Sequence, residues 1–125
     1  MSELKNQISQ FIDTNAKVYQ DISLAIHAKP EVSDFEYFAS QTLSEQLKKE
    51  GFEIELPAAG HRTGFAATYK SNKPGPTVVF LAEYDALAGL GHGCGHNVFG
   101  ATSSLAGAAL KSVVDRIGGE VRVYG

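Results

Sequence analysis

A continuous apolar run, followed by a glycine-rich stretch and a long segment rich in alanine, constrains this chain more than any other feature. Residues 77–82 (TVVFLA) are apolar on both faces, as in a central strand that is covered on both sides. Residues 85–97 contain four glycines, and residues 98–117 have the composition of a buried helix that ends before Gly118 and Gly119. This order predicts a strand, a loop and a helix at the centre of an α/β fold.

The rest of the chain predicts two more helices and three more strands. Apolar residues recur at helical spacing over residues 4–28, which indicates an amphipathic helix that ends near His27. A second helix is expected to begin at Ser33 or Asp34, either of which can cap it, and to end at Gly51. Period-two or apolar patterns predict further strands at residues 52–56, at a sheet edge, and at residues 63–69 and 120–125. We therefore expect a single α/β sandwich without a repeat or linker.

Composition excludes several classes of function. The 125 residues are 43% hydrophobic and 20% charged, as in a globular domain, and the net charge of −3 with scattered lysines argues against nucleic acid as a partner. The N-terminus lacks a signal-peptide pattern, and no apolar run approaches the roughly 18 residues of a membrane span. The single cysteine cannot form an internal disulfide. We expect a cytoplasmic protein with no membrane or nucleic-acid partner.

Side chains that can bind metal gather between the apolar strand and the helix that follows it. They are Glu83, Asp85, His92, Cys94 and His96. Sites in open α/β folds form beyond the carboxyl ends of strands, and alternate glycines let the backbone bend until neighbouring ligands converge. A thiolate with imidazoles favours zinc or another transition metal. Such an ion polarises a carbonyl and lowers the pKa of bound water to about 7, so hydrolysis is the natural chemistry.

Each of these residues also has a structural interpretation. Cys94 taken alone suits a small buried hydrophobic residue, and only the flanking histidines favour a metal ligand. His92 can be a ligand, a site-lining residue or a structural histidine. Glu83 and Asp85 can be solvated acids, metal ligands, or acceptors for the N–H of a ligating imidazole. A phosphate loop is a weak alternative, because the stretch lacks both a Gly-Lys-Ser/Thr ending and a dinucleotide fingerprint.

Two motifs in this region resemble one known family. Residues 81–87 (LAEYDAL) and 89–97 (GLGHGCGHN) are similar to sequences of the metal-dependent amidohydrolases and metallopeptidases that include aminoacylases, hippurate hydrolases, auxin-conjugate hydrolases and related dipeptidases. Residues 26–31 and 60–65 extend the resemblance over the chain. The resemblance implies a zinc-exopeptidase-like, helix-sheet-helix sandwich with a mixed, mainly parallel sheet. It also implies a separate lid domain, which often mediates dimerisation.

The resemblance assigns expected roles to four residues. Cys94 and His96 match the Cys-Gly-His motif and are expected metal ligands, and Asp85 matches the acid that orients the catalytic metal site. Glu83 falls where distant relatives have a ligating histidine, which makes it a third candidate ligand. Asn97 departs from the aspartate of many relatives. The expected cofactor is a divalent metal, zinc or manganese, with two ions in the full-length enzyme.

The resemblance also implies how much of an enzyme this sequence contains. Residues 1–125 would be the N-terminal portion of the catalytic domain, incomplete at the C-terminus, without the lid domain and the later glutamate and histidine residues. The expected activity is hydrolysis of an amide bond in N-acyl amino acids or short peptides, with the chain alone inactive and self-associating as a homo-oligomer. The alternative is a non-catalytic metal-binding or partner-binding α/β module derived from such an enzyme.

Overall fold

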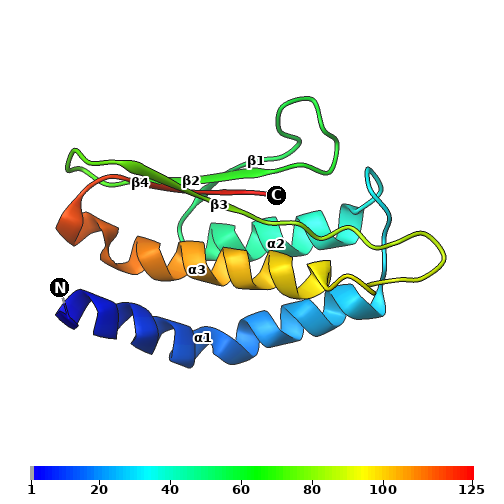
Figure 1. The fold of residues 1–125 in the computed structure, drawn as a ribbon. Coiled ribbons are helices and arrows are strands. Elements are labelled where there is room, and N and C mark those ends of the chain that lie inside the picture. Colours follow the sequence, from blue (N-terminus) through cyan, green and yellow to red (C-terminus); the bar gives the residue numbers. More distant parts are fainter. Residues whose placement is uncertain (1) are drawn as a thin grey trace.

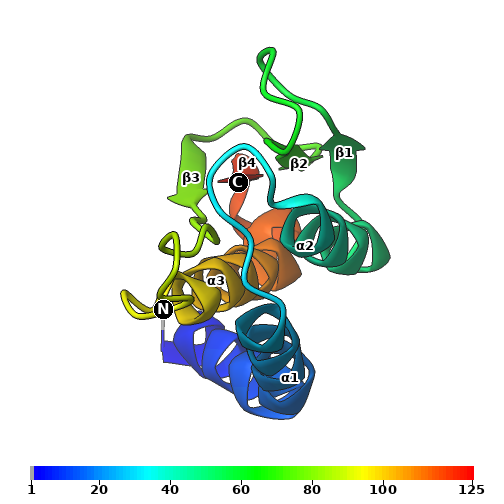
Figure 2. The ribbon, with the colours of Figure 1, turned by 90° about the vertical axis from the view of Figure 1, so that its right-hand side faces the viewer.

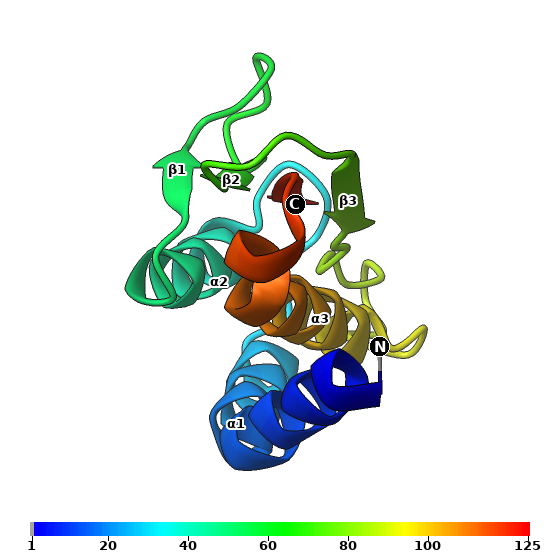
Figure 3. The ribbon, with the colours of Figure 1, turned by 90° about the vertical axis from the view of Figure 1, so that its left-hand side faces the viewer.

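The computed structural model describes residues 2–125 and shows three helices packed on one face of a four-stranded sheet (Figure 1). The elements in chain order are α1 (Ser2–Ala28), α2 (Tyr37–Lys49), β1 (Glu53–Glu55), β2 (Ala66–Lys70), β3 (Thr77–Leu81), α3 (His96–Ile117) and β4 (Glu120–Tyr124). Viewed from either end, α2 and α3 lie against the sheet and α1 lies beneath them (Figures 2 and 3). None of the described helices combines the length and the apolar character that a membrane crossing requires.

The sheet confirms the expected α/β class and corrects two details of it. The strand order is β1-β2-β4-β3, and β1 lies at an edge as its alternating pattern predicts. The sheet is mixed, but β1–β2 and β2–β4 are antiparallel and only β3–β4 is parallel, so the described part is not mainly parallel. The described helices cover one face, and the helix-sheet-helix arrangement is therefore not seen in residues 2–125.

The apolar strand β3 lies at the other edge of the sheet, so the prediction of a central strand is wrong for the described chain. Val78, Val79 and Leu81 are exposed, and β4 is the only strand that pairs with β3 among the described residues. An apolar run shows that a strand suits burial, but it does not specify which neighbours cover it. Within the described chain, the outer edge of β3 is consequently free.

The start of α2 also differs from the prediction. The helix begins at Tyr37, and Ser33 and Asp34 precede it in a turn in which Asp34 has a φ of 71°. The carboxylate of Glu31 instead accepts hydrogen bonds from two backbone N–H groups in the first turn, at 2.9 and 3.0 Å. A carboxylate here satisfies free N–H groups and suits the positive end of the helix dipole. Gly51, with a φ of 101°, follows the helix as predicted.

Helix α3 is the central helix and is held from two sides. On the sheet side, a Cβ at Gly107 would collide with Cγ2 of Val123, so only glycine permits this close approach. On the other side, the amide of Asn97 donates hydrogen bonds to the carbonyl and hydroxyl oxygens of Ser23 in α1, at 3.3 and 3.2 Å. These contacts fix the helix whose first residue is His96.

Replacement of Leu43 tests the described core. Leu43 is 0% exposed, so Leu43→Ala should lower the free energy of unfolding by about 2–5 kcal/mol through lost burial and a cavity. Leu24 is 66% exposed, so Leu24→Ala should change the free energy of unfolding by about 0.5 kcal/mol or less. Urea denaturation followed by circular dichroism measures both variants. Equal losses would contradict the packing of α2 described here.

Candidate metal centre

The candidate centre lies where β3 ends and α3 begins. Burial alternates strictly from residue 81 to residue 86, with even-numbered residues buried and odd-numbered residues more exposed. Successive side chains of an extended segment point to opposite sides. Glu83 and Asp85 therefore share one side of the segment, and Tyr84 between them points into the core.

The connection between α1 and α2 supports this segment. The backbone N–H of Ala86 donates a hydrogen bond to the carbonyl oxygen of Glu31 at 2.7 Å, and Val32 forms a parallel bridge with Ala86. The two connections thus meet at the same end of the molecule, which faces the viewer in Figure 2. Glu31 serves both elements, since its carboxylate caps α2 and its carbonyl holds the segment after β3.

The imidazole of His96 lies between two carboxylates. Its Nδ1 is 2.6 Å from Oδ1 of Asp85, and its Nε2 is 3.0 Å from Oε2 of Glu83. A neutral imidazole carries only one N–H and can donate to only one of these acceptors. Either a second proton or a metal cation is therefore required to make both contacts favourable.

The donor set fits a divalent cation. A histidine that binds metal through one nitrogen usually donates its other N–H to a carboxylate, and Asp85 is placed to accept that proton from Nδ1 of His96. Nε2 and the Glu83 carboxylate then remain as candidate ligands. Their separation of 3.0 Å is compatible with two ligands of one ion at bond lengths of about 2.0–2.2 Å.

Cys94 does not join this group in the structure. It is a free, exposed thiol in the loop before α3. Within residues 2–125, no three His, Cys, Asp or Glu side chains are arranged to hold a metal ion. Asp85 and Glu83 contact opposite nitrogens of His96, so these three residues do not converge on a single point. The structure thus brings together three of the four predicted residues.

His92 lies in the same loop and makes a different set of contacts. Both of its ring nitrogens are buried without a hydrogen-bond partner among the described residues, and its ring stacks on that of His27 at 6.2 Å between centroids. Burial lowers the pKa of His92, and the positive charges that His27 and His96 can carry lower it further. His92 is therefore favoured in its neutral form. No hydrogen bond joins its side chain to Glu83, Asp85 or His96.

A cavity of about 390 Å³ opens beside the three grouped side chains. Glu83, Asp85 and His96 form part of its lining, and Asp34, Glu36 and His61 form another part. Four carboxylates and no lysine or arginine line the cavity, so its potential favours cations.

No sequence pattern marks the second set of lining residues as part of a site. Asp34 was expected to cap a helix, and no role was assigned to Glu36 or His61. Asp34 and Glu36 lie about fifty residues before Glu83 and Asp85 along the chain, and no local pattern marks that contact. Only the folded connection between α1 and α2 brings them together.

Proteins similar in sequence to this chain support the resemblance that its loop motifs indicate. No model of a known protein family matches the chain. A p-aminobenzoyl-glutamate hydrolase from Escherichia coli (strain K12) is 31% identical over 144 residues, which cover 100% of this chain and 30% of that protein. The Xaa-Arg dipeptidase of Mus musculus is 34% identical over 127 residues, which cover 91% of this chain and 28% of the dipeptidase. The chain thus spans about three-tenths of the length of these relatives.

Solved structures agree with the fold. A protein from methicillin-resistant Staphylococcus aureus, described as an aminohydrolase, superposes with a TM-score of 0.82 at 27% identity, covering 95% of this chain and 34% of that one. The YXEP protein of Bacillus subtilis, described as a dinuclear metal-binding peptidase of the M20 family, gives a TM-score of 0.69 at 22% identity, covering 90% and 35%. The second likeness establishes the fold alone.

The resemblance expected from the loop motifs is therefore confirmed by both kinds of comparison. The alignment with the p-aminobenzoyl-glutamate hydrolase runs over the whole chain, and the superposition with the aminohydrolase covers nearly all of it. The chain belongs to the family of metal-dependent amidohydrolases and peptidases that its loop motifs resemble.

Proposed function

We propose that this chain forms part of a metal-dependent hydrolase site that cleaves amide bonds in N-acyl amino acids or short peptides. The observation that carries the proposal is the imidazole of His96 between Asp85 and Glu83, which requires an additional positive charge beside Nε2. The relatives supply the class of reaction, since one is a hydrolase of p-aminobenzoyl-glutamate and another is a dipeptidase.

Cys94, His96 and Glu83 are the proposed metal ligands. Thiolate and imidazole donors suit zinc, and the carboxylate also suits manganese. A divalent ion bound there would polarise the amide carbonyl and activate water for attack. The description of the Bacillus subtilis neighbour as dinuclear supports two ions in a complete enzyme. The acidic cavity supports cation binding independently of that comparison.

Asp85 is proposed to orient the site. Its Oδ1 accepts the Nδ1 proton of His96 at 2.6 Å, which leaves the lone pair of Nε2 directed toward Glu83. The hydrogen bond fixes both the tautomer and the direction of the ring, and it makes Nε2 a stronger ligand. Asp85 would thus act on the reaction through His96.

We further propose that residues 1–125 correspond to the N-terminal portion of the catalytic domain of a longer M20 enzyme. The coverage of about three-tenths of each relative supports this assignment. The remaining metal ligands, a glutamate general base and a lid domain would then come from further sequence. The second candidate is a non-catalytic metal-binding or partner-binding module. A reading frame that continues into a glutamate pair supports the enzyme, and a frame that stops supports the module.

The metal ligands can be tested by titrating the purified chain with zinc and manganese against a chromophoric chelator. Removing a ligand should weaken the strongest site, so His96→Ala and Cys94→Ala should each bind the ions at least about tenfold more weakly. Asp85→Asn keeps the shape but changes the acceptor for Nδ1, and a loss of about 10–100-fold is expected.

His27→Ala is the matched control for this titration, because His27 lies near the loop but outside the Glu83–His96–Asp85 group. It should bind metal as the unmodified chain does. Equal binding by the unmodified chain and His96→Ala would rule out the proposed centre, and retention by Cys94→Ala alone would remove Cys94 from the ligand set.

We also propose that the chain self-associates through the edge of β3. Unpaired backbone groups of an edge strand can pair with another chain, and β3 carries exposed valine and leucine with no charged residue in the strand. The expected partner is a second copy of this chain.

Light scattering at micromolar concentration tests this association. The unmodified chain should be a dimer or larger species, and Val79→Lys should shift it toward monomer because charge at an edge opposes strand pairing. Val18 on α1 is 42% exposed, close to the 41% of Val79, so Val18→Lys is a matched control that should leave the mass unchanged. A monomeric unmodified chain would contradict the proposal.

A further inference from the structure

We propose that Tyr84 is a positioning residue of the metal centre, whose buried side chain holds Glu83 and Asp85 in their contacts with His96. The inference rests on the proposed function, because it concerns the geometry of the same centre. It assigns a role to a residue that touches none of the proposed ligands through its own side-chain polar group.

Tyr84 is anchored on the side of the segment opposite the two acids. Its side chain is 4% exposed, its hydroxyl donates a hydrogen bond to the carbonyl oxygen of Thr63 at 2.6 Å, and its ring stacks on Phe65 at 6.0 Å with an interplanar angle of 5°. A rotation of the segment that turned the acids away from His96 would break this anchor.

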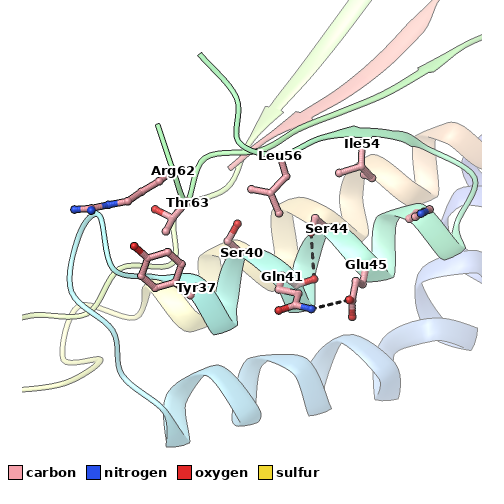
Figure 4. Close-up of a pocket in the computed structure, with 10 residues that line it drawn as sticks. Tyr37, Ser40, Gln41, Ser44, Glu45, Ile54, Leu56, Arg62 and Thr63 are labelled. Carbon is pink, nitrogen blue, oxygen red and sulfur yellow. Dashed lines mark hydrogen bonds between the residues drawn. The ribbon is translucent and has the colours of Figure 1, made fainter. Parts of the chain in front are cut away.

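The anchor continues into α2. Thr63 donates a hydrogen bond from Oγ1 to Oε1 of Glu36 at 3.0 Å, and Glu36 is the N-cap residue of α2. The side chains of Tyr84, Thr63 and Glu36 are all buried. Figure 4 shows Thr63 above the first turns of α2, with Ser40 nearby. Because unsatisfied buried polar groups are costly, the three residues constrain one another's positions.

Helix α3 supports the same segment from another direction. A Cβ at Gly100 would lie 2.9 Å from the carbonyl oxygen of Glu83 and 3.4 Å from Cβ of Tyr84. Gly100 stands one helical turn after His96, so the helix that carries the imidazole rests directly on the backbone of the acidic segment. The contacts of His96 with Asp85 and Glu83 therefore depend on where the Tyr84 backbone is held.

Tyr84→Phe is the test, because it keeps the ring and its stacking on Phe65 but removes the bond to Thr63. In the metal-free protein, the Hδ1 proton of His96 should be strongly deshielded by its short hydrogen bond to Asp85, and its NMR resonance should move upfield in the variant. Zinc and cobalt affinities should fall about tenfold, and the visible absorption of bound Co²⁺ should change because it reports ligand geometry.

Two controls separate positioning from general stability. Tyr19→Phe removes the hydroxyl of another buried tyrosine, 2% exposed on α1, and should leave the His96 resonance and metal affinity unchanged. Thr63→Val should reproduce the effect of Tyr84→Phe, and Thr63→Ser, which retains a hydroxyl for Glu36, should restore the original behaviour.

The outcomes are distinguishable from failure of the proposed function. An unchanged His96 resonance in Tyr84→Phe would overturn the inference whether or not metal binds, and so would equal perturbation by Tyr19→Phe. Failure of the unmodified chain to bind zinc and cobalt would instead reject the metal centre, while the His96 resonance would still decide the role of Tyr84.

Discussion

The contact between His96 and two carboxylates is the constraint on which the candidate site depends. Glu83 and Asp85 lie on the same side of one segment and line the same acidic cavity, so positive charge between them is favourable. The positive charge can come from a second proton on His96, which makes it an imidazolium, or from a cation bound beside Nε2.

The fold maintains this contact by holding the helix that carries His96 and the segment that carries the two acids through other contacts. The imidazole is attached to α3, which Asn97 holds against α1 and which Gly107 allows to lie close to the sheet. The acids are attached to the segment after β3, which Glu31 holds through its carbonyl oxygen. Because the helix and the segment are each held by such contacts, the short distances at His96 do not have to provide the stability that maintains them. The same arrangement gathers the described helices on one face and leaves the edge of β3 free.

Local patterns predicted much of this arrangement, and long-range contacts account for the rest. The helical periodicity of α1 and the composition of α3 are local signals, and both helices were predicted close to their observed bounds. The start of α2 was missed because the carboxylate that accepts hydrogen bonds from its first turn belongs to Glu31, six residues before Tyr37, and no local pattern marks that contact. Glu83, Asp85 and His96 were predicted because a strand end beside a helix start is visible in the sequence. The opposite wall of the cavity, including Asp34, was missed because folding alone brings it near.

The contrast between His96 and Cys94 indicates the order in which such a centre would be completed. His96, Asp85 and Glu83 are already in contact, whereas Cys94 is exposed in a loop beside Gly95, whose φ is 83°. A thiolate becomes a stable ligand only when a cation compensates its charge, and here it would have to enter a cavity that already contains four carboxylates. Approach of the Cys94 thiolate before an ion is bound would therefore add electrostatic repulsion. If His96 and Glu83 bound an ion first, its positive charge would offset this repulsion. Ligation by Cys94 would then be the later step, and the glycines beside Cys94 would permit the required movement.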